Sequence, residues 1–175
     1  MKKLFEKQKK LDDLILANLC KRVQMDITHK QLLDKDLLAV FVELGEFTKE
    51  HDTQEKKMLE FADLLHFLLS CGLALNIDET ISKHDITLLY AQAKENIYQD
   101  AILNFNVKFS EFCNAYRGAK YWSTDREPRN IEKHYFKCFL ALFDLAKTMG
   151  YSVQDIKNAY WEKNRENYKR QEGNY

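Results

Sequence analysis

Four acidic side chains in this 175-residue sequence lie within stretches that are otherwise apolar. Glu43 and Glu46 are embedded in LLAVFVELGEF, and Glu60 and Asp63 in MLEFADLLHFLLS. A carboxylate is rarely buried without a partner, because removing an isolated charge from water is very costly. The four acids therefore need a counter-charge. Oxygen donors of this kind suit a hard divalent cation, and Mg²⁺ is the best match.

The spacing of these acids predicts that they converge. Residues three apart lie on one face of a helix, so the two members of each pair project together. Residues 51–53 predict a break between the pairs, with Asp52 as the N-cap of the following helix. Helices joined by so short a connection tend to pack antiparallel, which turns both acidic faces toward one cleft. The alternative is that the acids pair with lysines on solvated faces. The nearest lysines in the sequence are Lys49, Lys56 and Lys57.

The stretch KNRENYKRQ near the C-terminus carries positive charge and amides. Lys163, Asn167 and Arg170 are spaced four and three apart, which aligns them on one helical face. Such a face suits a triphosphate and a polar nucleoside, because arginine forks onto phosphate and asparagine both donates and accepts hydrogen bonds. The alternative is a solvated helix end, where cations also offset the helix dipole.

Glycine and proline are scarce, at 5 and 1 residues, and the apolar residues recur with the period of a helix. Both features predict an all-α helical bundle that forms a single domain over residues 1–175. Residues 118–130 hold the proline and predict a loop, and Gly150 and Ser152 predict a helix end and the next helix start. The predicted helices span residues 3–20, 34–50, 53–75, 83–98, 100–116, 130–148 and 152 to the end.

Composition argues against several classes of protein, namely nucleic-acid-binding, membrane and secreted proteins. Basic and acidic residues number 27 each, which argues against broad binding to nucleic acid or to anionic membranes. Charges interrupt every apolar run, so no transmembrane span is expected, and the N-terminus lacks the features of a secretory signal. The cysteines show no CxxC spacing and predict free thiols in a cytoplasmic protein. They are Cys20, Cys71, Cys113 and Cys138.

With these motifs in place, the sequence resembles the all-α dimeric dUTPases, which belong to the wider MazG-like group of NTP pyrophosphohydrolases. Both ends and the middle of the chain contribute to the likeness. The motifs that carry it are Gln8-x-x-Leu11-Asp12-x-x-Ile15, ELGE at 43–46, EFADLLHFLLSCGL at 60–73 and GYSVQDIKNAYWEKNRENYKRQEGNY at 150–175.

The resemblance implies a homodimer with the site near the subunit interface. It implies Mg²⁺-dependent hydrolysis of dUTP, or a related deoxynucleotide, to dUMP and diphosphate, which would control dUTP and supply dUMP. It also implies that Glu43 or Glu46 orients or deprotonates the attacking water. The implied metal ligands are Glu43, Glu46, Glu60 and Asp63.

The resemblance further implies a set of substrate-binding residues. These are Gln8 and Asn167 for the base or sugar, His66 against the nucleoside, and Lys163 and Arg170 for the phosphates. For His66 the alternative is a core histidine bonded to an acid such as Asp63.

One part of the sequence departs from the family pattern. Family members carry an aromatic-lysine segment of the type FKxW between the acidic pairs, whereas HDTQEKK here has no aromatic residue. A similar string, AKYWS, stands at 119–123, where Lys120 and Trp122 are candidates for contacting phosphate and base. The alternative is that Trp122 anchors a surface loop. This departure bears on uracil selectivity more than on hydrolysis.

Two other functions remain open at this point. The first is a MazG-like pyrophosphohydrolase of broader specificity, which keeps the same acids and differs in the pocket. The second is a non-catalytic helical interaction protein whose acids merely pair with lysines. A P-loop and a zinc site are not expected, because neither motif has its required spacing in the sequence.

Overall fold

The computed structural model describes residues 1–50, 53–121 and 128–173, and every regular element in these ranges is a helix. The all-α prediction is therefore confirmed. The chain divides into two compact units, one formed by Met1–Asp78 with Gln154–Tyr175 and the other by Glu79–Val153. The single domain over residues 1–175 stays a prediction.

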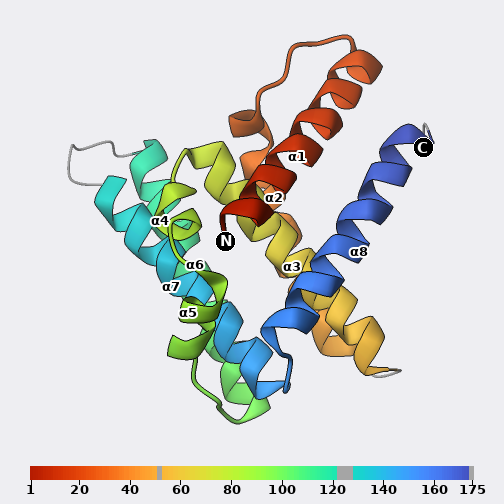
Figure 1. Cartoon of the computed structure of the whole chain (residues 1–175). Helices are drawn as coiled ribbons and strands as arrows, with labels where there is room; N and C mark the ends of the chain where they lie inside the picture. The colour runs from red at the N-terminus through yellow and green to blue at the C-terminus, as the bar shows by residue number, and fades with distance from the viewer. Residues whose placement is uncertain (51–52, 122–127, 174–175) are drawn as a thin grey trace. The chain divides into compact units, whose positions relative to one another are not determined.

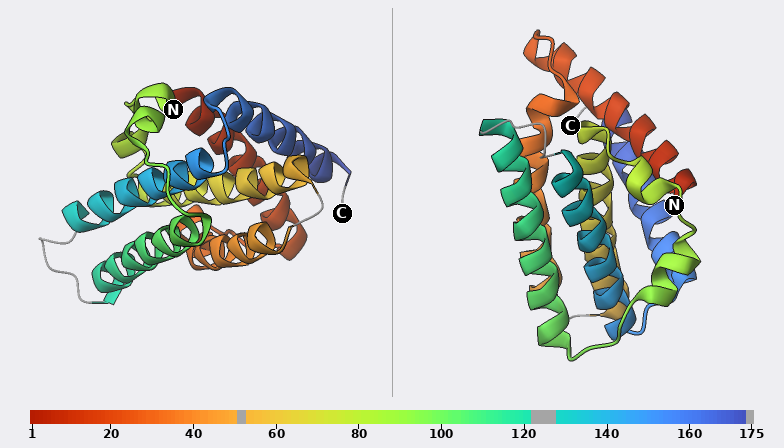
Figure 2. Two further views of the ribbon diagram at one scale, coloured as in Figure 1. Left: turned by 90° about the horizontal axis from the view of Figure 1, so that it is seen from below. Right: turned by 90° about the vertical axis from the view of Figure 1, so that its left-hand side faces the viewer.

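Four long helices build the first unit: α1 (Lys2–Val23), α2 (His29–Lys49), α3 (Gln54–Leu75) and, from Gln154 onward, α8 (Val153–Glu172) (Figure 1). α2 packs along α3, and α1 packs against α3 as well (Figure 2). Because the acidic pairs of the sequence fall on α2 and α3, this packing is what brings them together.

Two hydroxyl caps fix where the acidic helices begin. The Thr28 hydroxyl accepts a hydrogen bond from the Gln31 amide nitrogen at 3.3 Å, and the Gln31 side chain accepts from the Thr28 nitrogen at 2.8 Å. This capping box starts α2 five residues before the predicted position 34. α3 is capped by Thr53, which accepts from the nitrogen of Lys56 at 3.1 Å. Asp52, the predicted cap, lies outside the described residues.

α3 is buried along most of its length and forms the centre of its unit. By length and composition alone this helix is apolar enough to cross a membrane, with a mean hydropathy of 1.6 over 18 residues. The expectation that charges would keep every apolar stretch below transmembrane length was therefore wrong by this criterion. However, 61% of the window is buried inside the protein, as in a helix at the core of a bundle. Glu60 and Asp63 also interrupt its apolar surface.

The second unit contains α4 (Glu79–Ser82), α5 (Ile86–Gln92), α6 (Tyr98–Tyr121) and α7 (Pro128–Thr148). α6 and α7 pack along each other (Figure 2). Aromatic side chains from both helices form a continuous buried row between them. They are Phe105, Phe109, Phe112, Tyr135, Phe139 and Phe143.

The helix predicted over 83–98 was wrong in its extent, because the chain leaves the helix after Gln92. Beyond this point, side chains of α7 accept hydrogen bonds from backbone N–H groups. The nitrogen of Lys94 donates to Asp144 at 2.7 Å, and that of Asn96 donates to the Thr148 hydroxyl at 3.0 Å. These bonds replace helical ones with partners about fifty residues away in the sequence, which no local pattern reveals.

Helix ends in this unit also differ from the predicted loop at 118–130. α6 continues to Tyr121 and α7 starts at Pro128, so the described residues at both ends of that stretch are helical, and 122–127 lie outside the described residues. Proline suits a first helical position, because its missing N–H has no intrahelical acceptor there. The predicted helix end at Gly150 is confirmed, since its φ of +75° belongs to the left-handed region that favours glycine.

Candidate functional site

A cleft of about 620 Å³ opens in the first unit between side chains of α1, α2, α3 and α8. The site residues predicted on these four helices all line it. They are Gln8, Glu43, Glu46, Glu60, Asp63, His66, Lys163, Asn167 and Arg170. Packing of the four helices thus collects residues from both ends of the sequence around one opening.

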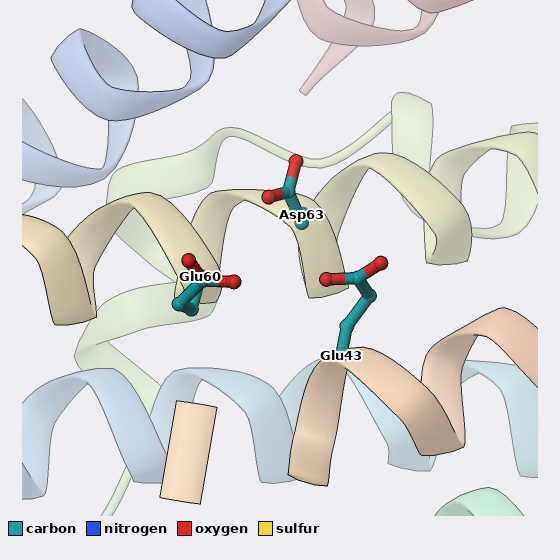
Figure 3. A group of neighbouring side chains, drawn as sticks. All are labelled: Glu43, Glu60 and Asp63. Carbon is teal, nitrogen blue, oxygen red and sulfur yellow. The ribbon is translucent and has the colours of Figure 1, made fainter. Parts of the chain in front are cut away.

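Three carboxylates form the acidic end of this cleft. Glu43 reaches from α2 toward α3, which carries Glu60 and Asp63 (Figure 3). One oxygen from each of the three lies within 4.8 Å of the others. Oxygen donors at this separation can share one divalent cation. Glu46 lines the same cleft but is exposed and is not among these three, so its role as a metal ligand stays a prediction.

Burial and mutual repulsion hold these acids toward their neutral form. Burial raises the pKa of Glu43 to about 7, and the neighbouring charges of Asp63, Glu46 and Glu60 add to the effect. Burial also raises the pKa of Glu60 and of Asp63, although Lys163 acts in the opposite direction on both. The acidic end therefore carries more negative charge than its surroundings compensate, and an added cation would relieve this excess.

The cation that the structure does place in the cluster is Lys163 of α8. Its Nζ lies 2.6 Å from Oδ2 of Asp63, and both side chains are largely buried, at 13% and 16% exposure. Burial alone would lower the pKa of Lys163, but the hydrogen bond to Asp63 and the nearby acids raise it. The lysines near the acids in sequence do not supply this contact; Lys57, for example, lies over the ring of Phe47 at 5.2 Å.

His66 is buried on α3, with 4% exposure. Its ring stacks on Tyr160 at 4.3 Å, and its Nε2 is 3.4 Å from the backbone oxygen of Tyr160. This contact, and not one with Asp63, is the hydrogen bond of the ring. Burial lowers the pKa of His66 to about 4, so the ring is neutral near pH 7. If Nε2 carries the proton, Nδ1 is an acceptor that has no partner among the described residues.

A buried polar network that the sequence did not predict surrounds Gln8. Its Nε2 donates to Oδ1 of Asp12 at 2.8 Å and to the hydroxyl of Ser70 at 3.0 Å, and Ser70 donates to the same Asp12 oxygen at 3.0 Å. The Tyr160 hydroxyl lies 3.2 Å from the amide oxygen of Gln8 and 3.0 Å from the backbone oxygen of Leu4. Both amide hydrogens of Gln8 are thus already engaged within the protein.

Asp12 lines the cleft beside this network and belongs among its functional candidates. Burial raises its pKa to about 7, against the opposing effect of its hydrogen bonds from Gln8 and Ser70. The signal that could have found it is the one used for the other acids. Asp12 follows an apolar residue in an amphipathic helix and stands one turn after Gln8, on the same face.

The remaining predicted residues divide into two groups. Arg170 lines the cleft with its guanidinium 2.6 Å from Oε1 of Glu166, an exposed pair within α8. Asn167 lines the cleft one turn earlier. Trp122 lies outside the described residues, and the side chain of Lys120 lies outside them too, so their proposed contacts with base and phosphate stay predictions.

Comparison with protein families identifies a match over most of the chain. A family model with the description dUTPase matches residues 1–92 and 127–175, which include every helix that lines the cleft. No curated protein and no solved structure matches the chain.

The Lys163–Asp63 pair predicts a measurable effect on stability without metal. Lys163→Met should lower the free energy of unfolding by about 2 kcal/mol in EDTA at pH 8, because it leaves the acids uncompensated. Urea unfolding followed by circular dichroism measures this, with Lys169→Met, an exposed lysine on the same helix, as the control. A variant as stable as the parent would show that the pair does not compensate the cluster.

Asp12 predicts a dependence of stability on pH. Its pKa is raised from 3.8 to about 7 on folding, so its contribution to stability is present at low pH and is lost as the pH rises through this interval. An asparagine side chain does not ionise. The free energy of unfolding of Asp12→Asn, relative to that of the parent, should therefore rise by about 1–2 kcal/mol from pH 5 to pH 8. Urea unfolding at both values measures the gain, and Asp26→Asn, at an exposed position of the same unit outside the cleft, is the control. An equal difference at the two pH values would contradict the shift.

Proposed function

The chain belongs to the all-α dUTPase family, and on that premise we propose that it hydrolyses dUTP to dUMP and diphosphate with Mg²⁺ as cofactor. The observation that supports this most is the convergence of Glu43, Glu60 and Asp63 from two helices, with ligand atoms within 4.8 Å of one another. A polar cleft large enough for a nucleotide adjoins them.

The chemistry of the donor set fits a hard divalent cation. Three carboxylates with raised pKa values face one another, and repulsion between them is what an added positive charge removes. We assign Glu43, Glu60 and Asp63 as ligands, with Glu46 beside them. When bound, Mg²⁺ supplies positive charge that offsets the negative charge of the substrate phosphates.

Glu46 is the better candidate of the first acidic pair for handling the attacking water. It lines the cleft but is exposed and stands apart from the three grouped carboxylates, so its oxygens are available for a water molecule. In this role it orients the water and accepts its proton while the bond between the α- and β-phosphates breaks. The reaction requires no nucleophilic side chain.

The other end of the cleft suits a nucleoside. The neutral His66 offers Nδ1 as an acceptor, and a uracil N–H or a sugar hydroxyl is a donor that would satisfy it. Asp12 supplies further acceptor capacity, held in place by Gln8 and Ser70. Lys163 and Arg170 serve the phosphates. Asp63 would be a ligand of the bound cation, which would free Lys163 from its contact with Asp63 to bind a phosphate oxygen.

We also propose that the active form is a homodimer. Leu38, Phe41 and Val42 are exposed on α2 at 67%, 40% and 57%, and their spacing places them on one face of the helix. An apolar face of this kind is typical of an interface between subunits. Because Glu43 and Glu46 follow on the same helix, a dimer through this face would hold the site close to the second subunit.

Hydrolysis is tested by diphosphate release from dUTP, dCTP and dTTP, with Mg²⁺ and with EDTA. Release from dUTP should require Mg²⁺, and Glu46→Gln should reduce kcat roughly 100-fold or more, because the amide keeps the shape but does not accept a proton. Glu55→Gln, an exposed acid at the start of α3, is the control.

Each outcome of this assay decides a separate point. A parental rate in Glu46→Gln would remove the role given to Glu46. Comparable turnover of dCTP or dTTP would replace uracil specificity with a broader pyrophosphohydrolase. An absence of diphosphate release from any nucleotide, with no effect of Mg²⁺ on thermal stability, would favour a non-catalytic helical protein.

The dimer is tested by light scattering coupled to size-exclusion chromatography. Leu38→Lys with Val42→Lys should halve the measured mass, because two charges on each copy would have to be buried in the interface. Leu88→Lys, at a residue of α5 that is 64% exposed, should leave the mass unchanged. A parent protein that elutes as a monomer would refute the dimer.

A further inference from the structure

We propose that a second, basic cleft beside the acidic one binds diphosphate and receives it as it leaves the site; the identity of this ligand rests on the proposed hydrolysis. The cleft lies in the first unit and has a volume of about 510 Å³. Its polar lining consists of Asn18, Lys21, Arg22, Lys35, Arg170 and Gln171.

The charge of this lining is one-sided. Four of these side chains are cationic, and none of the described residues that line the cleft is acidic. The whole chain, in contrast, has equal numbers of basic and acidic residues. Cations that line one concavity repel one another, and a polyvalent anion relieves that repulsion. Arginine adds two parallel donors that match two phosphate oxygens.

Helix ends explain only part of this grouping. Lys21 and Arg22 fall in the last turn of α1, and Arg170 falls in the last turn of α8, where a cation also offsets the helix dipole. Lys35 does not fit that explanation, because it lies in the second turn of α2, far from the C-terminal end of the helix. Its presence in the lining together with the other three cations favours a site for an anion.

The wall of the cleft is fixed by hydrogen bonds between α1 and α8. The amide nitrogen of Asn18 donates to the backbone oxygen of Gln171 at 3.2 Å and lies 3.3 Å from its side-chain oxygen. These contacts hold the last turn of α8 against the last turns of α1, so Arg170 stays near Lys21 and Arg22. The cations therefore share a common wall even though their side chains are exposed.

The basic cleft continues into the acidic one. Lys35, Arg170 and Gln171 line both of them. An anion released beside Glu43, Glu60 and Asp63 is repelled by these carboxylates, whereas the cations that line the basic cleft attract it. Arg170 can take part, because its exposed pair with Glu166 is weak in water and is easily exchanged for a phosphate. Diphosphate, with more charge than monophosphate, gains more from four cations.

Isothermal titration of the full chain with sodium diphosphate in EDTA tests the proposal, because the acidic end then attracts no anion. Lys21→Gln with Arg22→Gln should weaken diphosphate binding roughly tenfold, and Lys35→Gln, on another helix, should weaken it by a smaller factor. The matched control is Lys9→Gln with Lys10→Gln, which removes the same charge from exposed positions of α1 outside the cleft. Monophosphate should bind more weakly than diphosphate to the parent.

Three results would overturn the proposal. The first is unchanged binding of diphosphate in both cleft variants, and the second is an equal loss in the control, which would indicate a general charge effect. The third is equal affinity of the parent for monophosphate and diphosphate. These results are independent of nucleotide hydrolysis. A protein that hydrolyses dUTP but gives any of them refutes only the basic cleft. Selective diphosphate binding without hydrolysis would keep the cleft as a diphosphate site, but it would refute the proposed function and, with it, the role of the cleft in product release.

Discussion

The constraint on which the first unit depends is the charge of three carboxylates held within 4.8 Å of one another in a half-buried cleft. Like charges at this distance cannot all remain ionised without compensation. The protein answers in two ways. Glu43 is shifted toward its neutral form by burial, which raises its pKa to about 7, and Lys163 reaches Asp63 from α8 at 2.6 Å. These two effects compensate only part of the negative charge, so a cation would still be attracted to the acidic end.

The packing of α8 positions side chains at two places in the cleft, the acidic cluster and the network around Gln8. Tyr160 stacks on His66 and contacts the oxygens of Leu4 and Gln8, so one side chain of α8 is tied to both α1 and α3. One turn later, Lys163 enters the acidic cluster. The network around Gln8 is buried and hydrogen-bonded, which makes that end of the cleft rigid. The acidic end is instead held by the ion pair between Lys163 and Asp63, and each of these charges can bind another partner.

The charges of this unit are therefore separated along one groove, although the chain as a whole is neutral. Carboxylates gather between α2 and α3, and cations gather where α1, α2 and α8 approach one another. Arg170 and Lys35 line both parts. Under the proposed function, a nucleotide would bind at the acidic part together with a cation, and its diphosphate product would then meet the cation-rich part.

The sequence by itself determined the helical class and the pairing of acids on α2 and on α3. With the family resemblance, it also predicted the site candidates on α1, α2, α3 and α8 that line the cleft. Spacing within a helix fixes which side chains share a face, and apolar context identifies a carboxylate that needs a partner. Thr28 with Gln31 was also readable as a capping box, and the start of α2 would have been placed correctly from it.

Only the tertiary structure decided which partners these groups take. Asp63 pairs with a lysine one hundred positions away and not with its neighbours, Asp12 accepts a hydrogen bond from Ser70 of α3, and Glu46 stands apart from the other three acids. In the second unit, Asp144 accepts a hydrogen bond from the backbone nitrogen of Lys94, which lies where the helix predicted over 83–98 has already ended. The physical reason is the same in each case: the register between packed helices sets distances across the structure, and local periodicity contains no information about that register.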